Sequence, residues 1–165
     1  MFDDYLKIRN FNPQTQLLAI MKSIFESETK NKLVKRIESL SAEASPQWGK
    51  MDAGQMLWHC QYPLKIAIKN ENKGNGKLLM KLFKKSLYSE KPFKKNLPTA
   101  KFLIPTEAKD FNTEKEKLVQ LITETHDLKE RSQWSPHPMF GKFTHDQWGQ
   151  LEYKHLDHHL KQFGV

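Results

Sequence analysis

The stretch WGQLEYKHLDHHLKQF, residues 148–163, decides the fold that we expect for this chain. At about 100° per residue on a helix, its apolar side chains share one broad arc with His155 and His159. The opposite side carries polar side chains: Gln150, Lys154, Asp157 and Lys161. The two imidazoles therefore lie one turn apart and face the core, with His158 at the edge of the arc.

A buried imidazole needs a partner for each of its ring nitrogens. One metal ion would satisfy the rings of His155 and His159 together, and histidine is a common metal ligand. The alternative is a cluster of hydrogen-bonded core or surface histidines. We favour the metal ion, because three histidines within five residues are an uncommon way to fill a core.

The chain has 165 residues, which is enough for one domain with a hydrophobic core and too few for two comfortable ones. Glycine is scarce and Leu, Lys and Glu are common, so helices are favoured over sheets. The formal charge of +8 indicates a basic surface that could attract polyanions or anionic small molecules. Basicity alone is weak evidence for nucleic-acid binding, which we therefore disfavour.

The single cysteine, Cys60, excludes an internal disulfide. The N-terminus carries acidic residues early and has no apolar segment typical of a secretory signal. No uninterrupted apolar run approaches the roughly 20 residues of a membrane span. We therefore expect a soluble, cytoplasmic protein with no membrane partner.

The first 27 residues are expected to form an N-terminal arm and a short helix, and residues 28–165 a single helical domain. Asn12-Pro13 is typical of a helix start, and apolar residues follow at helical spacing over residues 17–25. A second helix is predicted to begin near residue 27 or 29 and to end by residue 40.

The next helix begins with a strong start signal. Asp52-Ala-Gly-Gln55 is typical of a capping box, and the helix is expected to continue to about residue 68 with His59 turned inward. Pro63 lies four residues after His59, where it cannot bond the His59 carbonyl. The sequence predicts either a bend centred on His59 or a helix that ends just before Pro63.

Residues 70–111 differ in character from the predicted helices. Leu and Phe residues over 78–87 suggest an amphipathic helix, and several prolines make the remainder irregular. Ten lysines fall in residues 69–101, against Glu71 and Glu90 alone. The simplest interpretation is a solvated excursion from the bundle, and the alternative is an anion-binding rim beside an active site.

Two more capping boxes are predicted downstream. Thr113-Glu-Lys-Glu116 opens a helix that ends near residues 127–131, and Thr144-His-Asp-Gln147 opens the last helix, with Phe143 and Trp148 forming a hydrophobic staple. Between them, two prolines keep residues 134–141 out of a helix. This aromatic loop, with His137 at its tip, is either a binding wall or a well-packed connection.

The chain contains no internal repeat, Gly-rich phosphate loop, paired-cysteine zinc motif or nucleophile elbow. The last helix also departs from the metalloprotease motif, because Leu156 rather than a glutamate follows His155. Any chemistry is therefore expected to come from the histidines.

Three stretches resemble the DinB/YfiT-like superfamily of metal-dependent four-helix bundles, in a branch catalogued as a domain of unknown function. They are WGKM with QMLWH (residues 48–51 and 55–59), HPMFG (residues 137–141) and YKHLDHHLKQF (residues 153–163). The resemblance covers roughly residues 28–163. It implies an all-α four-helix bundle with a long irregular crossover, to which this chain adds an extra N-terminal helix.

The resemblance also implies a divalent-metal site made of His59, His155 and His159, with His158 as a neighbour that is not a ligand. Three neutral imidazoles bind zinc, nickel, iron or copper well, with zinc or nickel the ions expected here, and they leave at least one coordination position open. Further side chains are candidates for the second shell or the pocket: Gln55, His137, Trp148, Glu152 and His158. Cys60 points about 100° away from His59 on a helix and is read as a small core residue.

These features favour a metal-dependent enzyme, a thiol S-transferase or a hydrolase-like protein, acting on a small molecule. The resemblance suggests a low-molecular-weight thiol as the substrate, whereas the catalytic residues stay unknown. The alternatives are a non-enzymatic, stress-related binding bundle with a basic face and a structural metal bundle. A homodimer is a further open alternative.

Overall fold

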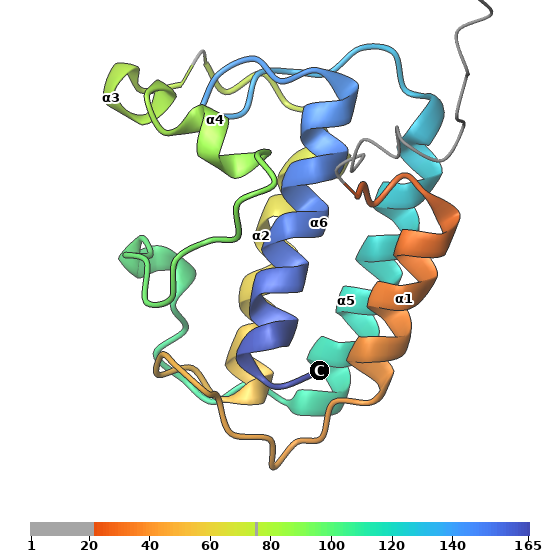
Figure 1. Ribbon diagram of the computed structural model, residues 1–165, viewed down its shortest axis with the longest axis vertical. Helices are drawn as coiled ribbons and strands as arrows, with labels where there is room; N and C mark the ends of the chain where they lie inside the picture. The colour runs from red at the N-terminus through yellow and green to blue at the C-terminus, as the bar shows by residue number, and fades with distance from the viewer. Residues whose placement is uncertain (1–21, 75) are drawn as a thin grey trace, which may run out of the picture.

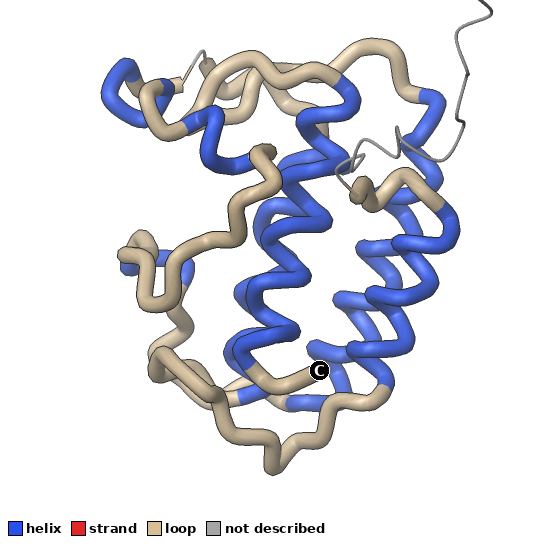
Figure 2. Tube along the Cα trace, viewed as in Figure 1, coloured by secondary structure: helices blue, strands red, loops and turns tan. Residues whose placement is uncertain are grey.

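The computed structural model describes residues 22–74 and 76–165, and its regular elements are all helical (Figures 1 and 2). The four long helices are α1 (Ser27–Glu38), α2 (Ala53–Lys69), α5 (Phe111–Asp127) and α6 (His145–Gln162). The short elements are α3 (Leu78–Lys81), α4 (Lys84–Leu87), and the 3₁₀ turns η1 (Lys101–Leu103) and η2 (Leu128–Glu130). The expectation of an all-α fold is confirmed.

The four long helices form a bundle in which α1 and α2 each pack against both α5 and α6. The start of α2 lies against Lys109, just before α5, and Arg131, just after α5, donates to the Ala67 carbonyl near the end of α2. These two helices therefore run parallel, and parallel neighbours need a long connection. Residues 70–110 provide it, and Figure 1 shows this crossover, in green, passing beside α2 and α6.

The core of the bundle is apolar and draws on all four long helices. Fully buried side chains include Leu33, Ile37, Met56, Leu57, Leu64, Leu118, Ile122, Leu156 and Leu160. Ile24, just before α1, is 0% exposed and belongs to the same cluster. Burial of each large aliphatic side chain contributes about 1.5–3 kcal/mol, so this core fixes the register of the helices that carry the histidines.

The capping boxes predicted for α2 and α6 are confirmed. The Asp52 carboxylate accepts from the Gln55 amide at 2.8 Å, and the Gln55 side chain accepts from the Asp52 amide at 3.1 Å. Thr144 and Gln147 exchange the same pair of bonds at the start of α6. Such caps contribute about 1 kcal/mol each. A single helix spans Pro63, so the version in which α2 ends before this proline is wrong.

The start predicted for α5 is wrong by three residues. The cap is Asp110 and not Thr113, because the Asp110 carboxylate accepts from the Thr113 amide at 2.8 Å. An earlier start places Phe111 against the core, and it brings the buried Glu114 within 2.6 Å of the Gln61 side-chain amide. Thr113 would offer neither contact as a cap.

The amphipathic helix expected over residues 78–87 is replaced by the two four-residue helices α3 and α4. Neither has a side-chain cap or a buried residue, so tertiary packing does not extend them beyond one turn each. Of the short N-terminal helix, residues 22–25 are not helical, with a turn at residues 24 and 25, and the part before residue 22 lies outside the described residues.

Lys154 was assigned to the polar side of α6, but it is 5% exposed. Its ammonium donates to the carbonyls of Ser86 and Ser89, at 2.5 and 2.9 Å, and lies 4.5 Å from the centre of the Phe93 ring. The crossover covers this side of α6, which the helical period of α6 alone could not reveal.

Candidate metal centre

His59, His155 and His159 lie together between α2 and α6. One ring nitrogen of each lies within 4.8 Å of the others. The closest approach joins His59 Nε2 to His155 Nε2 at 3.1 Å. Four ligands around a zinc ion at about 2.0–2.1 Å stand roughly 3.3 Å apart, so a small closing motion would bring all three nitrogens to ligand distance.

Hydrogen bonds fix the tautomers of two of these rings. The Nδ1 of His59 lies 2.8 Å from the Leu103 carbonyl, and a carbonyl oxygen only accepts, so His59 Nδ1 carries the proton. The Nδ1 of His159 lies 2.8 Å from Gln162 Oε1 and donates to it in the same way. Both Nε2 atoms are therefore left with a lone pair for a metal ion.

The Gln162 side chain is itself held in place. Its amide nitrogen donates to the Trp48 carbonyl at 2.5 Å, so its oxygen must face His159. Gly49 follows Trp48 with φ +84°, and a Cβ at Gly49 would lie 2.5 Å from the Gln162 amide nitrogen. Through their contacts with Gln162, residues 48 and 49 in the loop after α1 thus help to fix the orientation of the His159 ring.

Replacing Gly49 with alanine is expected to destabilise the protein by about 1–3 kcal/mol, because the new Cβ meets Gln162 and the backbone lies in the left-handed region. Denaturant unfolding measures the loss. Gly74→Ala is the matched control, since Gly74 also has a positive φ, +108°, but nothing lies within 4 Å of the added Cβ. Equal losses in the two variants would show that the contact with Gln162 contributes nothing.

Burial keeps the imidazoles neutral. It lowers the pKa of His59, against the raising effect of the Leu103 carbonyl, and it lowers the pKa of His159 to about 3. Burial also lowers the pKa of His155 well below its ordinary value, and the neighbouring histidines add to this effect. Neutral rings are the form that binds a metal ion.

A family described as "Protein of unknown function (DUF1569)" matches residues 21–164. The chain belongs to this family. No curated protein and no solved structure matches the chain. The family assignment covers all four long helices and the three histidines of the cluster.

The cluster in this DUF1569 chain is accompanied by buried polar atoms without partners. Among the described residues, both carboxylate oxygens of Glu152, the Nδ1 of His155 and the Nε1 of Trp148 are buried and make no hydrogen bond. Trp148, Glu152 and His155 share one face of α6 at spacings of four and three residues. A metal ion on the Nε2 of His155 would place the proton on its Nδ1, so that His155 and Trp148 would each have a donor for the Glu152 carboxylate.

The remaining sequence candidates lie at different distances from the cluster. Gln55 bonds the carbonyls of Pro105 and Glu107, at 3.2 and 3.4 Å, and so holds the chain that follows η1 rather than a histidine. The His158 ring lies 5.1 Å from the His159 ring, between Trp48 and Phe93 at 5.6 Å each.

Cys60 is buried and its sulfur contacts the Met56 sulfur at 3.6 Å. Burial raises the pKa of its thiol, so it remains protonated.

Two contacts of the cluster, the Leu103 carbonyl and Gln162, were missed from the sequence. Gln162 had a signal, its spacing of three residues from His159, whereas a backbone carbonyl in an irregular crossover has none.

His137 and Trp148 belong to a second, aromatic cluster at the start of α6. The His137 ring lies 5.5 Å from the Trp148 ring and 4.9 Å from the Phe140 ring, and its Nδ1 accepts from the Met139 amide. Trp148 precedes His155 by seven residues, about 10 Å along the helix. The packed-connection interpretation of this loop therefore agrees better with its contacts than the binding wall.

Acidification from pH 7 to pH 5 is expected to destabilise the protein in part through His137, since burial lowers its pKa to about 4. Between that value and about 6.5, the unfolded chain takes up a proton that the folded chain does not, so stability falls as the pH drops. The full effect is about 3 kcal/mol. The free energy of unfolding, measured in urea, should depend less steeply on pH for His137→Phe than for the wild type. The same pH dependence in both proteins would show that His137 does not contribute to the acid destabilisation.

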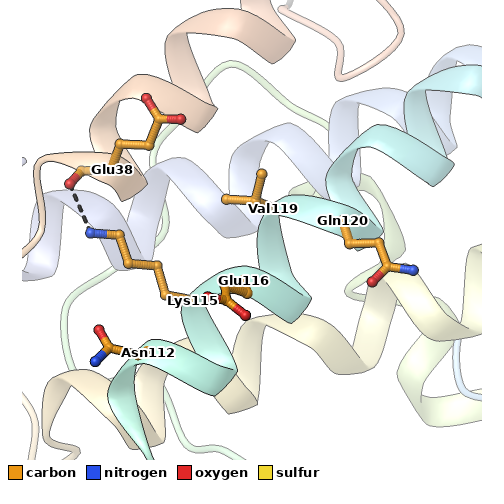
Figure 3. Close-up of a pocket in the computed structure, with 6 residues that line it drawn as sticks. All are labelled: Glu38, Asn112, Lys115, Glu116, Val119 and Gln120. Carbon is orange, nitrogen blue, oxygen red and sulfur yellow. Dashed lines mark hydrogen bonds between the residues drawn. The ribbon is translucent and has the colours of Figure 1, made fainter.

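A surface depression lies away from the histidines, between the end of α1 and the first half of α5 (Figure 3). It is lined by Glu38, Asn112, Lys115, Glu116, Val119 and Gln120. Lys115 bonds the Glu38 carbonyl at 2.7 Å, and no histidine reaches it. We assign it no function. None of the helices described is long and apolar enough to cross a membrane.

Proposed function

We propose that this protein is a metal-dependent enzyme of the DinB/YfiT type, with His59, His155 and His159 as ligands of one divalent ion. The convergence of two Nε2 lone pairs carries this proposal, because the Leu103 carbonyl and Gln162 hold the protons of His59 and His159 on the far side of each ring. Three neutral imidazoles, two of them buried and one half-buried, fit zinc or nickel better than calcium or magnesium, which prefer oxygen ligands.

Three protein ligands leave a coordination position for a substrate, as in catalytic rather than structural sites. Such an ion would supply Lewis-acid chemistry and would lower the pKa of a bound water or thiol. The chain supplies the orientation of each ligand, through Leu103 for His59 and Gln162 for His159. Glu152 is the candidate partner of His155, whose Nδ1 is otherwise without one among the described residues.

The substrate proposed is a small, low-molecular-weight thiol, and the reaction is S-transfer or a hydrolase-like step. Aromatic side chains beside the cluster support a small-molecule pocket: Trp48, Phe93 and His158. Lys95 lies over the Trp48 ring at 4.5 Å and would favour an anionic substrate. A cytoplasmic location is part of the proposal, and it agrees with the free thiol of Cys60.

The test uses full-length protein purified without an affinity tag. We expect one equivalent of a transition metal by elemental analysis, and a cobalt-substituted protein whose visible spectrum gains a sulfur-to-metal band when a small thiol is added. A protein that takes up no zinc, nickel or cobalt would overturn the metal site. A cobalt spectrum indifferent to thiols, with a melting temperature that falls on chelation, would indicate a structural metal instead.

A further inference from the structure

One segment, which overlaps most of the crossover, carries the net charge of the whole chain. Residues 69–101 contain ten lysines and two glutamates, a net charge of +8, which equals the formal charge of all 165 residues. The remainder contains seventeen basic and seventeen acidic residues and is neutral. The electrostatic attraction of this protein for an anionic partner is therefore concentrated on one segment.

The same segment exposes a cluster of large apolar side chains. Leu78, Leu79, Leu82 and Phe83 are 84%, 69%, 77% and 58% exposed. They lie in α3 and directly after it, and the exposed Lys77, Lys81 and Lys85 lie in the same short segment. Exposed apolar clusters of this kind mark interaction sites rather than ordinary surface.

Polar anchors hold this segment on the bundle, so its leucines are not needed for folding. The Lys77 amide donates to the Met139 carbonyl at 2.9 Å, and the Lys84 ammonium bonds the Lys142 carbonyl and lies 4.9 Å from the centre of the Phe143 ring. The buried Lys154 holds the carbonyls of Ser86 and Ser89. The leucines of α3 are therefore left exposed to solvent. Figure 1 shows α3 at the rim of the molecule.

We propose that residues 77–85 dock on an anionic membrane surface, with Leu78, Leu79, Leu82 and Phe83 inserted at the level of the lipid headgroups. The exposed lysines of the segment, Lys77, Lys81 and Lys85, would pair with lipid phosphates. Leucine and phenylalanine beside lysine are the composition of interfacial segments that lie on a bilayer without crossing it. The absence of a membrane-spanning helix among the described residues does not bear on such a segment.

Two other possible binding partners match the charge and composition of this segment less well. A second copy of the chain would bring a second segment of charge +8 against the first, and like charges repel. A nucleic acid would use arginine and stacked aromatic rings, whereas residues 69–101 contain no arginine and their most exposed large apolar side chain is Leu78. Burial of the exposed leucine side chains in lipid is favourable, whereas contact with nucleic-acid bases is not a favoured interaction of leucine.

Sedimentation of the full chain with vesicles tests the proposal. We expect binding to mixed phosphatidylcholine and phosphatidylglycerol vesicles to exceed binding to phosphatidylcholine alone by about tenfold or more, and to weaken with added salt. Leu78→Ser/Leu82→Ser should reduce binding about tenfold with an unchanged melting temperature, since both side chains are already exposed.

Charge reversal separates local from overall electrostatics. Lys81→Glu/Lys85→Glu should abolish the preference for anionic vesicles, whereas Lys35→Glu/Lys129→Glu, which changes the net charge equally at exposed sites on α1 and η2, should preserve it. Equal binding to both vesicle types, or equal loss in both charge variants, would overturn the proposal. So would a dimer in sedimentation velocity that Leu78→Ser/Leu82→Ser dissociates. The histidines take no part, so His59→Ala should bind vesicles normally.

Discussion

Replacing His59 or His155 with alanine is expected to abolish stoichiometric metal binding. Each variant removes one of three nitrogens that lie within 4.8 Å of one another, and two remaining imidazoles hold a first-row ion far less tightly. The loss of affinity should exceed the roughly 10–100-fold that follows from losing an outer-shell partner. Elemental analysis of tag-free protein and titration with zinc measure it.

The same variants should lose the stabilisation that metal gives. An ion present at about a thousand times its dissociation constant stabilises the folded state by roughly 4 kcal/mol, so zinc should raise the melting temperature of the wild type and leave the variants unchanged. His158→Ala is the matched control on α6, because His158 neighbours His159 but is not one of the three. Metal content that survives in both alanine variants would refute the site.

The sequence predicted the histidine-bearing helices well, because both begin with signals that act locally. Capping boxes at Asp52 and Thr144 fix where α2 and α6 start, and the start fixes which side chains face inward. The proximity of His155 and His159 follows from helix geometry alone. The approach of His59 does not, since it depends on how α2 packs against α6, and only the family resemblance suggested it.

The crossover was the least predictable region, for a physical reason. Its residues neither alternate nor repeat, and its contacts to the bundle run through backbone carbonyls, such as Leu103 to His59 and Ser86 to Lys154. Any residue type can supply a carbonyl, so these contacts leave no pattern in the sequence. The α5 start was also missed, because residues 113–116 match a capping box and only the structure shows that Asp110 caps the helix and that Phe111 packs on the core.

Glu152→Leu is expected to change the metal-free and metal-loaded proteins in opposite directions. Burial raises the pKa of Glu152 to about 8, and its carboxylate oxygens have no partner among the described residues. A carboxyl whose folded pKa is raised from about 4.5 costs stability as the pH rises through that interval, because the unfolded chain ionises first. At pH 7 the cost is about 3 kcal/mol. Leucine removes it, so the metal-free variant should be more stable at pH 7 and less dependent on pH.

Metal binding should respond in the other direction. When the Nε2 of His155 binds an ion, its Nδ1 carries the proton, and Glu152, three residues earlier on the same face of α6, is the acceptor nearest in the helix register. The second oxygen can accept from Trp148 Nε1, which is also buried without a partner among the described residues. Loss of this acceptor in Glu152→Leu should weaken zinc binding about 10–100-fold.

Glu152→Gln separates the two effects, because it removes the titrating group while keeping an acceptor oxygen for His155. We expect it to share the flatter pH dependence of Glu152→Leu and to retain most of the zinc affinity. A Glu152→Leu protein that binds zinc as tightly as the wild type would show that His155 needs no carboxylate. A Glu152→Leu protein less stable than the metal-free wild type at pH 7 would show instead that the buried carboxyl has a partner in solution, since only a satisfied group is costly to replace with an apolar one of similar size.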